Sequence, residues 1–113
     1  MGKDFFNVGE GVDILFNLLK NTQLKPVETE ILTYKQVIQF FIENQPKGTE
    51  EFRGVILKEP HDNGCIVRQV FLDKENNIIN NNKGRPIINL VLATRIDDEL
   101  NEYFDDKDTI IVE

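Results

Sequence analysis

The sequence contains one cysteine, one histidine and no tryptophan. A single cysteine excludes an internal disulfide framework and a cysteine-rich zinc site, and a single histidine excludes a metal centre built from several imidazoles. No apolar run approaches the roughly 20 residues of a membrane-spanning helix, and the first residues lack the basic-then-apolar order of a signal peptide. We therefore expect a cytoplasmic protein that neither binds a membrane nor needs a metal or another cofactor.

The composition is that of a globular protein. Of the 113 residues, 40% are hydrophobic and 29% are charged, which argues against a disordered chain and against a coiled coil. The length fits one domain better than two, and no repeat or linker-like stretch divides the chain. A single domain over residues 1–113 is predicted.

Negative charge is concentrated at one end of the chain. The net charge is −7, and residues 95–113, with eight acidic and two basic side chains, carry −6 of it. A negative field repels phosphate backbones and attracts basic surfaces. Direct nucleic-acid binding is therefore disfavoured, and the acidic segment is a candidate docking surface for a basic protein. The alternative is a solvated helix face that keeps a small protein soluble.

Two amphipathic helices are predicted ahead of the strands. The first covers residues 11–21, and the second opens with the capping-box pair Thr33 and Gln36 and runs to Asn44. Residues 21–29 between them are predicted to be a loop, because the proline among them disfavours helix at the preceding position. The apolar stripes of the two helices consist of Val12, Leu15, Phe16 and Leu19, and of Tyr34, Val37, Ile38, Phe41 and Ile42.

From residue 51 onward the pattern favours strands. Phe52–Glu59 and Cys65–Asp73 are rich in β-branched and aromatic residues, and the Asn-Gly pair between them is a strong hairpin signal. Pro86–Ala93 is almost continuously apolar, which predicts a central strand buried on both faces. Thr109–Val112 is predicted to be a short last strand.

A third helix is predicted to be capped by Thr94. Its apolar underside consists of Ile96, Leu100, Tyr103 and Phe104, and its wet face carries Asp98, Glu99, Glu102 and Asp105. The helix is long enough to make a parallel crossover between the last two strands. The predicted fold class is α+β: two N-terminal helices packed on a small mixed sheet made of a hairpin, a buried strand, a helix crossover and a short C-terminal strand.

Few residues are suited to catalysis. His61 and Cys65 flank the predicted hairpin turn, but a Cys-His pair needs the imidazole within reach of the sulfur, and Cys65 is predicted to point into the sheet. The acidic residues near the C-terminus lack the central glycine of a calcium-binding loop. The basic turn Lys83-Gly84-Arg85 is able to contact a phosphate, although its surroundings do not resemble a P-loop. We predict no enzyme, no catalytic residue and no metal site.

The predicted function is a non-catalytic protein-interaction module, or an accessory or inhibitor-type subunit, whose acidic C-terminal helix docks a basic partner. The predicted partner-binding residues are Asp98, Glu99, Glu102 and Asp105. Self-association is a second predicted mode of interaction, because a last strand at a sheet edge is able to pair with another chain. Two alternatives from other classes are a small-molecule or nucleotide-sensing domain with a pocket between helices and sheet, and a structural component of a phage or other particle.

Overall fold

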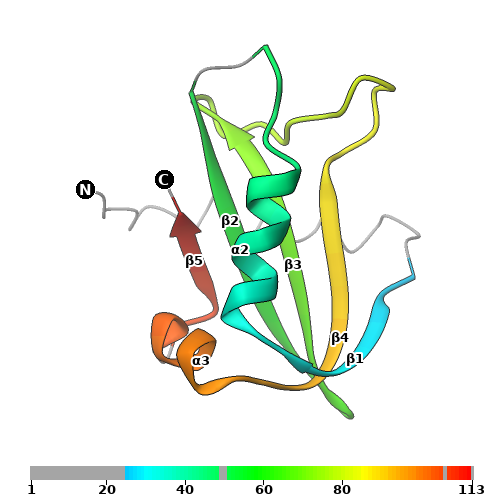
Figure 1. Ribbon diagram of the computed structural model, residues 1–113, viewed down its shortest axis with the longest axis vertical. Coiled ribbons are helices and arrows are strands. Elements are labelled where there is room, and N and C mark those ends of the chain that lie inside the picture. The colour runs from blue at the N-terminus through cyan, green and yellow to red at the C-terminus, as the bar shows by residue number, and fades with distance from the viewer. Residues whose placement is uncertain (1–24, 49–50, 106, 113) are drawn as a thin grey trace.

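The computed structural model describes residues 25–48, 51–105 and 107–112. In chain order they form β1 (Val27–Leu32), α2 (Tyr34–Glu43), β2 (Phe52–His61), β3 (Gly64–Asp73), β4 (Ile88–Ile96), α3 (Asp98–Phe104) and β5 (Thr109–Val112). The strands make one mixed sheet in the order β1-β4-β3-β2-β5, and α2 crosses one face of it (Figure 1). The β1–β4 pair is parallel and the other three pairs are antiparallel. In the part of the chain described, no helix is long and apolar enough to cross a membrane.

The N-terminal part of the fold corrects the predicted fold class. Within the described ranges one helix, α2, precedes the hairpin, so the prediction of two N-terminal helices is wrong. The helix predicted over residues 11–21 lies outside the described residues. Strand β1 takes up part of the predicted loop. It pairs with β4 far along the chain, with Val27 opposite Val91, and a local pattern carries no signal of such distant pairing.

Helix α2 begins at the predicted capping box. Thr33 Oγ1 accepts a hydrogen bond from Gln36 N at 3.1 Å, and Gln36 Oε1 accepts one from Thr33 N at 3.0 Å. The buried side chains Val37 and Phe41 face the sheet. The Phe41 ring lies directly over Gly54 of β2, where a Cβ atom would lie 2.8 Å from two ring carbons. The missing side chain at this position therefore lets α2 approach the sheet closely.

A buried glutamine fixes α2 on the sheet. Gln69 of β3 is fully buried. Its Nε2 donates to the Val37 carbonyl oxygen at 2.9 Å, and its Oε1 accepts from Asn89 Nδ2 at 2.9 Å. Because a buried amide is costly unless both of its ends are hydrogen-bonded, this arrangement sets the position of α2 relative to β3 and β4.

The β2–β3 hairpin confirms the turn predicted from the Asn-Gly pair. The register places His61 opposite Gly64, so Asp62 and Asn63 form the turn. Gly64 has a φ of 140°, and a Cβ atom there would lie 2.0 Å from the Ala93 carbonyl oxygen. Both the backbone conformation and the space require glycine at this position.

The second face of the sheet carries its own apolar cluster. The buried members are Val55, Leu57, Val70 and Leu72, with Ile78, Ile88 and Ile111 packed against them. Strands β2 and β3 are therefore buried on both faces. Strand β4 lies inside the sheet as predicted, between β1 and β3, but many of its side chains are half-buried.

The C-terminal elements differ from the prediction in their cap and in their pairing. Strand β4 continues to Ile96 and includes Thr94, because Arg95 still pairs with Ile31 of β1. Asp97, and not Thr94, caps α3. Strand β5 has the predicted bounds, but it pairs antiparallel with β2 at the sheet edge, so α3 is not the predicted parallel crossover.

Candidate functional site

The four acidic residues predicted to bind a partner all lie on α3. Asp98 and Glu99 are in its first turn, Glu102 follows one turn later and Asp105 is the C-cap, and all four are exposed. Their spacing places Asp98, Glu102 and Asp105 on one side of the helix, with Glu99 beside them. We call these four residues the acidic surface. Helix α3, which carries this surface, lies at the lower left of Figure 1, near the start of α2.

Asp97 holds the acidic surface in place. Its Oδ1 accepts a hydrogen bond from Leu100 N at 2.9 Å, which caps α3, and its Oδ1 and Oδ2 accept from Tyr34 N at 3.1 and 3.2 Å. One carboxylate therefore satisfies N-terminal N–H groups of both helices. Beneath it, Leu100 and Phe104 are fully buried, and Lys58 Nζ lies 4.7 Å from the centroid of the Phe104 ring. Helix α3, which carries the acidic surface, is therefore capped at its N-terminus and packed on the core.

A stacked aromatic pair adjoins the acidic surface. The rings of Tyr34 and Tyr103 have centroids 4.6 Å apart and an interplanar angle of 11°. Tyr103 is 56% exposed, so its assignment to the apolar underside of the helix was wrong. Its position at the border between the buried and acidic sides of α3 explains the error. Burial, the neighbouring Tyr103 and the Glu99 carboxylate raise the pKa of Tyr34 above its ordinary value.

His61 and Cys65 do not form a catalytic pair. The hairpin register places His61 opposite Gly64 and Cys65 opposite Pro60, so the two side chains lie on opposite faces of the sheet. His61 is exposed, and its Nδ1 accepts a hydrogen bond from Asn63 N at 3.3 Å. Cys65 packs against the core beneath the helices. No cluster of three or more histidine, cysteine or acidic side chains suited to a metal ion occurs among the residues with a described position.

The Cys65 thiol is predicted to react slowly. Burial raises its pKa, and the opposing effect of Lys58 is smaller. Because the thiolate is the reactive form, we expect iodoacetamide to alkylate the native protein several times more slowly than the urea-unfolded protein at about pH 8. The native rate should still be rising above about pH 9. Mass spectrometry of timed samples measures both rates, and equal rates would show that Cys65 is not shielded.

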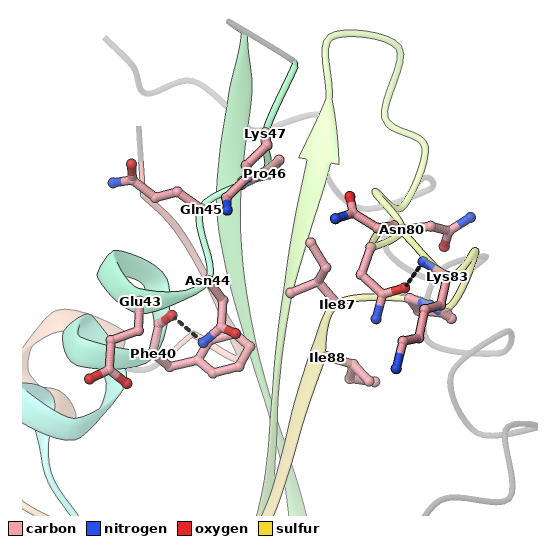
Figure 2. Close-up of a pocket in the computed structure, with 13 residues that line it drawn as sticks. Phe40, Glu43, Asn44, Gln45, Pro46, Lys47, Asn80, Lys83, Ile87 and Ile88 are labelled. Atoms are coloured by element: carbon pink, nitrogen blue, oxygen red, sulfur yellow. Dashed lines mark hydrogen bonds between the residues drawn. The ribbon is translucent and has the colours of Figure 1, made fainter.

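A cleft of about 500 Å³ lies at the other end of α2, between the residues that end this helix and those that lead into β4. Figure 2 shows Ile87 and Ile88 between the end of α2 on one side and the loop that contains Asn80 and Lys83 on the other. The apolar lining consists of Phe40, Pro46, Pro86, Ile87 and Ile88, and the carboxamides are Asn44, Gln45, Asn80, Asn81 and Asn82. The charged lining consists of Glu43, Lys47 and Lys83.

Both walls of the cleft are held by local hydrogen bonds. Asn81 Oδ1 accepts from Lys83 N at 2.8 Å and from Arg85 N at 3.1 Å, and Asn81 N donates to the Arg85 carbonyl oxygen at 2.7 Å. Across the cleft, Asn44 Nδ2 donates to the Phe40 carbonyl oxygen at 2.9 Å (Figure 2). Nothing local in the asparagine-rich sequence of residues 76–82 indicates that part of it faces the end of α2.

Comparisons with known proteins give no relative. No protein-family model, no curated protein and no solved structure matches this chain.

Proposed function

We propose that this protein is a non-catalytic interaction module that binds a basic protein through α3. The observation that carries the proposal is the gathering of four exposed carboxylates on a short helix, beside a stacked tyrosine pair in which Tyr34 is half-buried and Tyr103 is exposed. Tyrosines supply much of the binding energy at the centres of protein interfaces, and charges at the rim steer the partner. The partner would present lysines or arginines around a shallow apolar depression that receives Tyr103.

The charge distribution favours a basic protein over a nucleic acid. Residues 95–113 carry −6 of the net charge of −7, and a nucleic acid would meet this field with its own negative phosphates. A basic surface would be attracted over roughly the Debye length, about 8 Å at physiological salt. We place this interaction in the cytoplasm, where a single free thiol stays reduced.

Site-specific crosslinking in the native host tests the proposal. A photoreactive amino acid at Tyr103 is expected to capture a protein with a basic surface. The matched control position is Ile42 on α2, which is apolar and 58% exposed but does not belong to α3, and it should not capture the same protein. Capture of a second copy of this chain, or of no protein, from position 103 would contradict the proposal.

A charge-neutral variant then tests the acidic surface itself. The acid-neutral variant carries D98N, E99Q, E102Q and D105N, and the control variant carries E28Q, E30Q, D62N and E75Q. Both sets replace exposed acids, and both change the net charge from −7 to −3. Capture from position 103 should be lost in the acid-neutral variant and kept in the control variant. Asp98 and Glu99 also stabilise α3 by about 0.5 kcal/mol each, because their negative charges lie near the positive end of the helix dipole. Melting temperatures are therefore compared to confirm that both variants are folded.

A further inference from the structure

We infer that the cleft at the C-terminal end of α2 binds a nucleoside monophosphate. The cleft is distinct from the acidic surface. Helix α2 runs from Tyr34, which stacks on Tyr103, to Glu43, which lines the cleft. Its ten residues span about 15 Å. The inference does not depend on the proposed partner, because no residue of the acidic surface lines the cleft.

The size and the apolar lining fit a flat ring. A volume of about 500 Å³ falls within the usual range for small-ligand sites, about 300–1,000 Å³. Phe40 and Ile87 contribute an aromatic ring and a branched aliphatic side chain to the lining. The Phe40 ring is itself held by Phe41 and Phe71, at centroid distances of 5.9 and 6.3 Å. A planar heterocycle against these side chains would bury its faces and leave its edges to polar groups.

The carboxamides fit the edge of a nucleobase. Each asparagine or glutamine side chain offers both donors and an acceptor, and the edges of nucleobases present donors and acceptors side by side. Asn44 has its Nδ2 engaged with the Phe40 carbonyl oxygen, which leaves Oδ1 as an acceptor. Asn80 and Asn82 approach from the opposite loop and Gln45 from the α2 side. A ligand without a hydrogen-bonding edge would make no use of these amides.

The cleft offers charge partners for a phosphate group on both of its sides. Lys47 and Lys83 line opposite sides of the cleft, with Glu43 as the one acid in its lining. An ammonium group is an effective point-charge partner for phosphate. Of the Lys83-Gly84-Arg85 turn, which is able to contact a phosphate, Lys83 lines the cleft. Each lysine is able to pair with a phosphate group on its own side of the cleft, whereas a neutral sugar would use neither charge.

Titration calorimetry on the full chain tests this inference with AMP, GMP, CMP and UMP, the four corresponding nucleosides and inorganic phosphate as separate probes. At least one monophosphate should bind with a Kd below about 1 mM. Its nucleoside and inorganic phosphate should each bind at least about tenfold more weakly, because each lacks half of the contacts. Absence of binding by all four monophosphates, or equal binding by phosphate alone, would overturn the inference.

A lysine variant locates the site. Lys47 and Lys83 are exposed, so K47Q/K83Q should fold normally, and its melting temperature checks this. We expect it to bind the best monophosphate at least about tenfold more weakly, while the matched variant K35Q/K74Q, which removes the same charge from other exposed positions, stays within about twofold of the wild type. Equal affinities of the two variants would place the binding elsewhere and overturn the inference.

Discussion

Replacing Gly54 by valine is expected to lower the free energy of unfolding by about 3 kcal/mol, at the upper end of the usual cost of overpacking. The new Cβ atom would lie 2.8 Å from two carbons of the Phe41 ring. That ring has little room to retreat, because it packs edge-on against Phe71 at a centroid distance of 5.3 Å and also contacts Phe40. Helix α2 would have to move away from the sheet, which would strain its hydrogen bond to Gln69.

Urea denaturation followed by circular dichroism measures this loss. Gly54→Ala should give an intermediate loss, and combining it with Phe41→Leu should cost less than the sum of the two single changes, because the smaller side chain makes space for the Cβ atom. A Gly54→Val protein as stable as the wild type would show that α2 does not sit as close to β2 as described.

Replacing Asp97 by alanine is expected to lower the free energy of unfolding by about 2–3 kcal/mol, because it removes an N-cap and leaves a partly buried N–H group without its acceptor. Leu100 N donates the N-cap hydrogen bond to Asp97. The partly buried N–H group that would lose its acceptor is that of Tyr34 at the start of α2. Asp97→Asn, which keeps one acceptor oxygen, should lower the free energy of unfolding clearly less. Thermal and urea unfolding measure both losses.

The neighbouring Asp98 supplies the control for this experiment. Asp98 is exposed and belongs to the same first turn, so Asp98→Ala should cost only a few tenths of a kcal/mol, about the size of a helix-dipole interaction. If the Asp97→Ala and Asp98→Ala proteins were equally stable, the conclusion that the Asp97 carboxylate joins α2 to α3 would be wrong. Asp97→Ala should also weaken partner binding, since α3 would lose its fixed orientation.

Local signals predicted several elements well. The Thr33–Gln36 capping box, the hairpin between β2 and β3 and the bounds of Thr109–Val112 all appear in the structure as the sequence indicated. Each of these depends on a few adjacent residues, whose backbone conformation is decided by capping, turn chemistry or β-branched side chains. The acidic side chains of α3 were likewise predicted to be exposed, because the helical period alone separates them from Leu100 and Phe104.

The errors come from interactions between distant residues. Strand β1 was missed because it forms by pairing with β4, and the same pairing draws Thr94 into a strand so that Asp97 becomes the cap. The antiparallel pairing of β5 with β2 carries no local signal either. The residues that line the cleft were not predicted for the same reason, since its two walls, around Asn44 and around Asn81, are far apart in the sequence.

The affinity of the protein captured at Tyr103, measured with purified components at about 50 and about 300 mM NaCl, tests the central claim most directly. At low salt the acid-neutral variant should bind at least about tenfold more weakly than the wild type, and the difference should shrink at high salt. The control variant, with the same net charge, should match the wild type within about twofold. Equal weakening of both variants would show that overall charge, and not the acidic surface of α3, attracts the partner, and would contradict the account given above.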